Sequence, residues 1–404
     1  MVRSRSAARL RVSKWVQDWK NERFAVPIRR LAPLYVLGVL LCSCATSVAT
    51  GSDQRQDASD IEAKRALLDA RVPRWLEEYD VPSAAVAYVV DREVALSQVW
   101  GEQAPGEPAT PETLYNVASL TKPIVAETVL RLVNEGRLSL DEPLARYWVD
   151  PDVADDPRSQ VLTPRIVMRH ESGLPNWRYE TNDVLRFIGD PATEVKYSGE
   201  AFEWLAKAVQ NKLRTPFEAL AKQYVLEPVR MNRTAFVRQP WFEGHLAEPY
   251  AKGKELRNVV RDEFLAADDM RTTVSDYARF LIDVMNGGGV SAELASQRTA
   301  ISRHDPSMER CVSKLDSAPP CPRTLGWTTG WFVLDYGAET IVSHSGGDHG
   351  EKTFAFYSPE RSEGVVVFTN GANGHHVMFK IAEALYRNDD FAALLRPDPI
   401  PGEP

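Results

Sequence analysis

Segments with the features of β-strands lie at both ends of this 404-residue chain, and segments with helical periodicity occupy its centre. Apolar runs bounded by turn residues predict strands. The expected strands cover residues 81–90, 94–100, 326–335, 340–345, 352–357 and 364–369. The expected helices cover residues 61–79, 119–134, 202–213, 216–225, 274–286 and 375–386. The absence of a regular β-α-β alternation argues against a doubly wound parallel sheet. We therefore expect an α+β fold: one antiparallel sheet built from both ends of the chain and flanked by the N- and C-terminal helices, with a mainly helical domain inserted.

Charge is distributed unevenly along the chain. Residues 1–43 contain nine Lys and Arg against two Asp and Glu, whereas the remainder contains 39 against 54. Because an acidic body offers no basic surface for nucleic acid, we expect no nucleic-acid partner. We predict a signal peptide over residues 1–43, a flexible tether over 44–60, one folded domain over 61–390 and a Pro-rich tail over 391–404.

The basic leader has the parts of a secretory signal, with positive charge followed by the apolar stretch Leu31–Leu41 and small residues. That stretch is shorter than the roughly 20 residues of a membrane-spanning helix. Leu41-Cys42-Ser43-Cys44 resembles a bacterial lipobox, with Cys44 as the lipidation site. We therefore expect an exported protein of the bacterial cell envelope, anchored to the membrane by an N-terminal lipid and facing the periplasm or the exterior. The alternatives are an uncleaved anchor and a signal cleaved near Ala49, and the long basic region suggests an over-extended N-terminus.

Two further cysteines, Cys311 and Cys321, lie close together in a polar segment that contains proline. In an exported chain this spacing predicts a local disulfide bond. The alternative is a pair of exposed thiols, and neither cysteine has neighbours that suggest catalysis.

Ser119-Leu120-Thr121-Lys122 has the spacing S-x-x-K at the start of an expected helix. Residues three apart share a helix face, so Lys122 is expected beside Ser119. A hydroxyl is a weak nucleophile until a base takes its proton, and the positive end of the helix dipole favours the resulting alkoxide. An N-cap serine with a solvated lysine explains the tetrapeptide equally well.

Several separated stretches make the chain recognisable over about residues 62–388. These stretches are NVASLTKP (116–123), RHESGLPNW (169–177), PATEVKYSGEAF (191–202), VLEPVRMNRTAF (225–236), MRTTVSDYARFL (270–281), HSGG (344–347) and GVVVFTNGANG (364–374). In this order they resemble the serine β-lactamase and penicillin-binding-protein superfamily, specifically the class C β-lactamase-related branch that also holds esterases and D-amino-acid peptidases. The resemblance implies one hydrolase domain, with an α/β lobe over 61–115 and 326–390 and a helical lobe over about 116–325.

The resemblance also implies an active site in which Ser119 is the acylated nucleophile and Lys122 its partner. Tyr197 matches the tyrosine of the Y-x-N element of the family, whose phenol shares base and acid duties with the lysine. The third element, usually K-T-G, corresponds to His344-Ser345-Gly346. The main-chain amides of Ser119 and Gly347 would then form the oxyanion hole.

Two departures from the family pattern narrow the expected substrate. Gly199 stands where β-lactamases have the asparagine of Y-x-N, and His344 stands where they have a lysine that faces the substrate carboxylate. A neutral histidine holds a carboxylate less firmly than lysine does. We therefore expect hydrolysis of an ester or of a small amide or peptide. The alternatives are a D,D-carboxypeptidase or weak class C-like β-lactamase, and a non-catalytic lipoprotein that binds peptidoglycan.

Other candidate sites are weaker. His344, Asp348 and His349 do not have the spacing of a closed ligand set, so we expect no metal and no cofactor. Glu200 is a candidate contact for a substrate amine or, equally, a helix-start carboxylate. Trp177 and Trp331 are candidates for the cleft wall, although core packing is the better interpretation for at least one of them.

Overall fold

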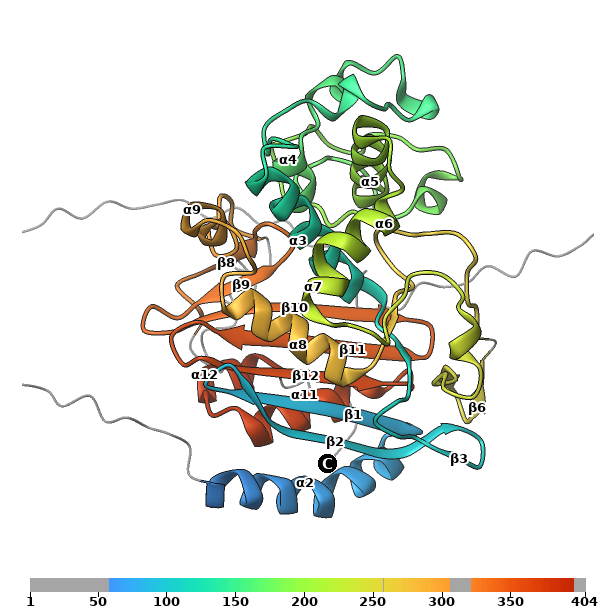
Figure 1. Ribbon diagram of the computed structural model, residues 1–404, viewed down its shortest axis with the longest axis vertical. Coiled ribbons are helices and arrows are strands. Elements are labelled where there is room, and N and C mark those ends of the chain that lie inside the picture. Colours follow the sequence, from blue (N-terminus) through green and yellow to red (C-terminus); the bar gives the residue numbers. More distant parts are fainter. Residues whose placement is uncertain (1–57, 257, 306–320, 396–404) are drawn as a thin grey trace, which may run out of the picture. The chain divides into compact units, whose positions relative to one another are not determined.

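A computed structural model describes residues 58–256, 258–305 and 321–395, and its central feature is an eight-stranded antiparallel sheet (Figure 1). The order of the strands is β3-β2-β1-β12-β11-β10-β9-β8. Their bounds are Ser83–Val90 (β1), Glu93–Ala104 (β2), Glu107–Pro108 (β3), Thr324–Trp327 (β8), Phe332–Asp335 (β9), Thr340–Asp348 (β10), Glu351–Ser358 (β11) and Glu363–Thr369 (β12). Strand β1, the first of these strands along the chain, pairs with β12, the last one, and Ala84 lies opposite Thr369. This pairing confirms the prediction of one antiparallel sheet built from both ends of the chain.

Both faces of the sheet are buried, each against a different set of helices. The outer layer consists of α2 (Ala58–Glu78), α11 (Gly374–Leu385) and α12 (Asp389–Leu395). Because successive strand residues point to opposite faces, Val86 and Tyr88 of β1 pack in the core shared with this layer. Ala85 and Ala87 belong to the second core, on the opposite face. A strand buried on both faces reads as a continuous apolar run, as β1 does.

The second core includes the helices that carry or support the expected catalytic residues. These helices are α3 (Thr121–Asn134), α5 (Gly199–Leu213) and α8 (Val274–Met285). Helix α3 is buried from Thr121 through Leu132. Its Glu127 carboxylate accepts two hydrogen bonds of 2.7 Å from the Arg298 guanidinium, and both side chains are almost fully buried. A bidentate pair of this kind fixes geometry as well as charge, so the helix is held on all sides.

The segment expected to be one strand over 326–335 is two strands, β8 and β9, joined by a tight turn. Gly330 has a φ of 81° in this turn, and a Cβ at this position would lie 2.3 Å from the Cβ of Ala126. The turn therefore packs directly against α3. The pattern of apolar residues along the chain does not reveal this contact.

Some predicted features lie outside the described residues. Cys44 and the leader fall there, as does Cys311. Cys321 is disulfide-bonded, but its pairing with Cys311 stays a prediction. None of the helices in the described ranges combines the length and the apolar character needed to cross a bilayer.

Candidate active site

Ser119 lies in a 3₁₀ turn, Ala118–Leu120, that leads directly into α3. The preceding residue, Ala118, has a φ of 47°, which is an uncommon conformation for a residue with a Cβ. Two hydrogen bonds hold it there: its amide donates to Asn116 Oδ1 at 3.0 Å, and its carbonyl accepts from Thr121 Oγ1 at 2.6 Å. Local strain that is maintained by dedicated partners is a feature of functional sites.

Lys122 is fully buried, and its ammonium group has two acceptors. Nζ donates to Ser119 Oγ at 3.0 Å and to the carbonyl oxygen of Ala267 at 2.7 Å. The structure therefore brings the serine and the lysine together as the S-x-x-K spacing predicted. The alternative interpretation, an N-cap serine with a solvated lysine, is wrong, because Lys122 is buried.

Tyr197 also lies next to the lysine. Lys122 Nζ is 4.9 Å from the centre of the Tyr197 ring. Tyr197 precedes Ser198, the N-cap of α5, whose hydroxyl accepts a hydrogen bond from the amide of Ala201 at 3.0 Å. The cap fixes the start of the helix, and with it the position from which the phenol projects.

His170 supports Tyr197 and was missed as a functional residue by the sequence analysis. The two rings lie 4.2 Å apart between centroids. His170 Nδ1 accepts a hydrogen bond of 3.1 Å from the amide of Ser198. Burial, assisted by the charge of Lys122, holds the pKa of His170 well below its usual range, so the ring is neutral. The motif His170-Glu171-Ser172-Gly173 could have marked this histidine as a candidate. Its distance from Tyr197 in the sequence hides the contact between the two rings.

The third element lies on β10, which runs against the turn that carries Ser119. A Cβ at position 346 would lie 2.1 Å from the carbonyl oxygen of Val117, so only glycine permits this close approach. Thr353 Oγ1, on the neighbouring strand β11, donates to the same carbonyl at 2.9 Å. Ser345 and Gly347 are exposed. The oxyanion hole assigned to the amides of Ser119 and Gly347 stays a prediction.

His344 is buried and cannot present a positive charge to a substrate. Its Nδ1 donates to the carbonyl oxygen of Ser345 at 2.7 Å, and its Nε2 has no hydrogen-bond partner among the described residues. Burial, with a contribution from the charge of Lys122, lowers the pKa of His344 to about 3. The ring packs against Trp327, with centroids 5.2 Å apart.

The indole of Trp177 lies against the Y-x-N position. A Cβ added at Gly199 would lie 3.1 Å from two ring carbons of Trp177 and 3.1 Å from the carbonyl oxygen of Asn176. These contacts are tighter than ordinary van der Waals packing, so a larger residue at 199 would displace the indole. Trp331, by contrast, is fully buried and belongs to the core.

Glu200 has the role of a helix-start carboxylate rather than that of a free anion in the cleft. Its oxygens accept from the amide of Arg178 at 3.0 Å and from Nη2 of the same residue at 2.7 Å. The guanidinium group also binds Asp150 at 3.0 Å. Glu200 therefore ties the start of α5 to the preceding loop.

Glu203, one turn further along α5, acts on Lys122 through the main chain. Its Oε1 accepts from the amides of Ala266 and Ala267 at 2.8 and 2.9 Å. Ala267 is the residue whose carbonyl oxygen binds the lysine ammonium. Burial raises the pKa of Glu203 to about 7. No sequence motif marks this residue, because its partners are backbone groups more than sixty positions away.

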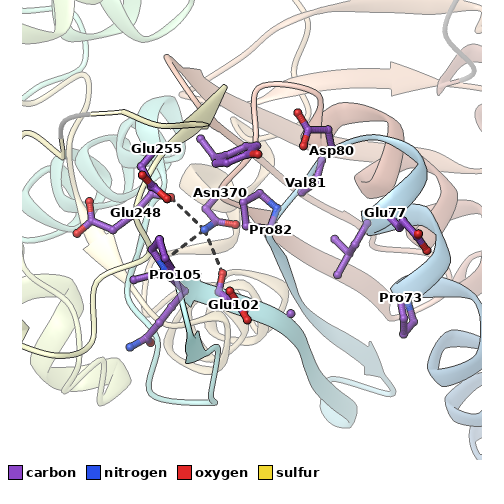
Figure 2. A pocket seen from close by; sticks show the side chains of 15 residues that line it. Pro73, Glu77, Asp80, Val81, Pro82, Glu102, Pro105, Glu248, Glu255 and Asn370 are labelled. Atoms are coloured by element: carbon purple, nitrogen blue, oxygen red, sulfur yellow. Dashed lines mark hydrogen bonds between the residues drawn. The ribbon is translucent and has the colours of Figure 1, made fainter. Parts of the chain in front are cut away.

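A cavity of about 540 Å³ lies at another part of the molecule, between the end of α2, the start of β1 and the end of β2 (Figure 2). Its lining includes Glu77, Asp80, Glu102 and Asn370, and none of the expected catalytic residues. The Asn370 amide is already used, because it donates to the carbonyl oxygens of Glu102 and Glu248 at 3.3 and 3.0 Å. This cavity is therefore no part of the Ser119 site.

We predict that Glu203→Leu lowers kcat for an activated ester about 10-fold to 100-fold, because the carbonyl that positions Lys122 loses its support and small displacements of catalytic groups cost that much. Glu203→Gln keeps an acceptor oxygen and should retain most of the activity. Steady-state kinetics, with circular dichroism as a check of folding, tests both variants. An equal loss in both would show that the charge of Glu203 matters rather than its hydrogen bonds.

Comparison with known proteins identifies the family of the chain. The family model described as Beta-lactamase matches residues 64–386. Protein flp from Staphylococcus aureus (strain MW2) is 24% identical over 325 residues, which cover 75% of this chain and 62% of that protein. Esterase EstB from Burkholderia gladioli is 34% identical over 244 residues, covering 53% of this chain and 62% of the esterase. The chain therefore spans about three fifths of the length of these curated relatives.

Solved structures share the fold at low sequence identity. The penicillin-binding protein homologue from Pyrococcus abyssi has a TM-score of 0.66 at 22% identity, over 80% of this chain and 78% of that one. D-alanine carboxypeptidase AmpC from Burkholderia cenocepacia has a TM-score of 0.66 at 20% identity, over 81% and 99%. With the family model matching most of its length, the chain belongs to the beta-lactamase family of serine hydrolases.

Proposed function

We propose that this protein is an exported serine hydrolase that cleaves an ester or a small amide or peptide bond through an acyl-enzyme on Ser119. The observation that carries the proposal is the hydrogen bond of 3.0 Å from a fully buried Lys122 ammonium to Ser119 Oγ. Tyr197, whose ring centre lies 4.9 Å from the same ammonium, is the third member of the proposed catalytic set.

The reaction would proceed in two steps. In the first, the Lys122–Tyr197 pair, holding one proton fewer than an ammonium and a phenol together, takes the proton of Ser119 Oγ. The oxygen bonds to the substrate carbonyl carbon, and the oxyanion forms at the amides of Ser119 and Gly347. Collapse of this intermediate breaks the bond to the leaving group, which takes the proton from the same pair. In the second step, a water molecule gives one proton to the pair and attacks the acyl carbon. The bond to Ser119 Oγ then breaks, the pair returns the proton to this oxygen, and the acid is released.

The walls of the site favour substrates without a carboxylate next to the scissile bond. The third-element position holds a neutral, buried His344, and the Y-x-N position holds Gly199 covered by Trp177. Neither supplies the charged or amide contact used by β-lactamases. The relative named as an esterase supports the same choice of substrate.

The second candidate is a D,D-carboxypeptidase or weak β-lactamase, favoured by the fold shared with a D-alanine carboxypeptidase. The third is a non-catalytic lipoprotein that binds peptidoglycan. The paired and buried Lys122 argues against the third, because a binding protein gains nothing from enclosing an ammonium group next to a serine hydroxyl.

Incubation with a fluorophosphonate probe should add one adduct to the wild type and none to Ser119→Ala, as measured by intact mass. Short-chain nitrophenyl esters should be turned over by the wild type and not by Ser119→Ala, while nitrocefin and a D-Ala-D-Ala peptide should be poor substrates. Absence of a Ser119-dependent adduct would refute the enzyme proposal. Preferential cleavage of the peptide would favour the carboxypeptidase.

An asparagine at position 199, as in the Y-x-N element, should fit only when the Trp177 indole that lies against this position is removed. We predict that Gly199→Asn alone destabilises the protein and gains no activity on nitrocefin, because its Cβ meets Trp177 at 3.1 Å. Trp177→Ala combined with Gly199→Asn should raise the ratio of nitrocefin to ester turnover above that of Trp177→Ala alone. A ratio unchanged by the second substitution would contradict our explanation of the substrate preference.

We also propose export and lipid attachment at Cys44, on the evidence of the basic leader and the lipobox-like junction. Mass spectrometry of the mature N-terminal peptide, isolated from bacterial membranes, should find a diacylglyceryl group on Cys44. Cys44→Ala should release the protein from the membrane fraction, whereas Cys42→Ala should not. An unmodified mature N-terminus near Ala49 would contradict the lipid anchor.

A further inference from the structure

His170 contacts the segment that carries Tyr197 at three points. Its carbonyl oxygen accepts a hydrogen bond from the amide of Lys196 at 2.7 Å, and its Nδ1 accepts one from the amide of Ser198 at 3.1 Å. Its ring packs on the Tyr197 ring, with centroids 4.2 Å apart. One residue therefore binds the main chain on both sides of the tyrosine and also contacts the phenol itself.

The backbone of His170 is held in the conformation that permits these contacts. Its φ is 55°, in the left-handed region that residues with a Cβ seldom adopt. Its amide donates to the carbonyl oxygen of Val167 at 2.9 Å, and the carbonyl oxygen of the next residue, Glu171, accepts from the amide of Ala192 at 2.8 Å. Hydrogen bonds on both sides thus maintain an uncommon conformation, which is a feature of functional sites.

The hydrogen bond to Ser198 fixes the tautomer of the imidazole. A main-chain amide can only donate, so Nδ1 carries the lone pair and the proton of the neutral ring lies on Nε2. Nε2 is buried and makes no hydrogen bond to the described residues. A buried N–H without a partner is costly, so packing alone would favour a phenylalanine at this position. What the imidazole adds to a phenyl ring here is the acceptor for the Ser198 amide.

The imidazole is itself enclosed by aromatic rings. Trp327 meets the His170 ring edge-on, with centroids 4.5 Å apart, and also lies 5.2 Å from the Tyr197 ring. Phe202, on α5, lies 5.3 Å from the imidazole. The side chain that binds the Tyr197 segment therefore has little freedom to move.

We propose that His170 is a positioning residue that sets the orientation of the Tyr197 phenol toward Lys122 and Ser119. This role rests on the proposed function, because the orientation of the phenol matters for proton transfer at Ser119 Oγ. His170 would affect kcat rather than substrate binding, because its side chain is fully buried and cannot touch a substrate. A displacement of about 1 Å in a catalytic group can cost roughly 100-fold in rate.

The test is a double-mutant cycle with Tyr197→Phe, which removes only the hydroxyl group. His170→Phe keeps a ring but removes the acceptor, whereas His170→Asn keeps an acceptor oxygen but removes the ring. With Tyr197 present, each should lower kcat for a nitrophenyl ester about 10-fold to 100-fold and change KM by less than about threefold. In the Tyr197→Phe background, each should cost less than about twofold more, since the hydroxyl that His170 orients is gone.

Val377→Ala is the control for general destabilisation, because Val377 is fully buried in the core on the other face of the sheet. Its kcat should be unchanged, and circular dichroism checks the folding of every variant. Equal losses with and without the Tyr197 hydroxyl would overturn the positioning role, and so would an unchanged kcat in both His170 variants. A wild type without Ser119-dependent turnover would instead refute the proposed function, and this role with it.

A second measurement does not depend on turnover. Nitrogen NMR of histidine-labelled wild type at neutral pH, with His170 assigned from the resonance lost in His170→Asn, should show a neutral ring with its proton on Nε2. This is the tautomer that the Ser198 amide requires. A proton on Nδ1, or a charged imidazolium, would show that His170 does not hold the Tyr197 segment in this way and would overturn the inference.

Discussion

The enclosed ammonium group of Lys122 is the constraint on which the rest of the site depends. A buried charge is costly unless acceptors are placed for it. Here the acceptors are Ser119 Oγ, the expected nucleophile, and the carbonyl oxygen of Ala267. The carbonyl is held in turn by Glu203, whose carboxylate binds the adjacent amides. Burial, with a smaller contribution from the same charge, keeps His344 neutral, so Lys122 contacts Ser119 and also contributes to the low pKa of His344.

The sheet fixes the position of the turn that carries Ser119 relative to β10. Because both of its faces are buried, its strands cannot slip in register without moving side chains into the wrong core. Strand β10 therefore approaches the turn of Ser119 at one position, where Gly346 leaves room for the carbonyl oxygen of Val117. Helix α3 is equally confined, by the buried pair of Glu127 and Arg298. Ser119 is thus held between two elements that have little freedom to move.

The sequence predicted the parts of this design that depend on short-range spacing. The sheet from both ends of the chain follows from apolar patterns, and the contact between Ser119 and Lys122 follows from a helical separation of three. Other features depend on main-chain groups or on tertiary contacts and leave no pattern. Glu203 binds backbone amides, His170 packs on a tyrosine 27 positions later, and Asp348 lies close to aspartates eighty positions earlier. The break between β8 and β9 was missed for the same reason, since Gly330 is required by its packing on α3.

The two departures from the family pattern, Gly199 and His344, are each accompanied by packing that the loss of one side chain does not explain. A chain that had only lost the asparagine of Y-x-N would leave a gap at Gly199, yet the Trp177 indole lies against that position. A chain that had only lost the third-element lysine would leave its replacement exposed, yet His344 is enclosed by Trp327 and bonded to Ser345. In both places an apolar surface has replaced a polar contact, while Ser119, Lys122 and Tyr197 remain in register. Selection for a binding role alone would preserve neither this pairing nor its supports. The combination therefore supports the proposal of a hydrolase that acts on a neutral substrate.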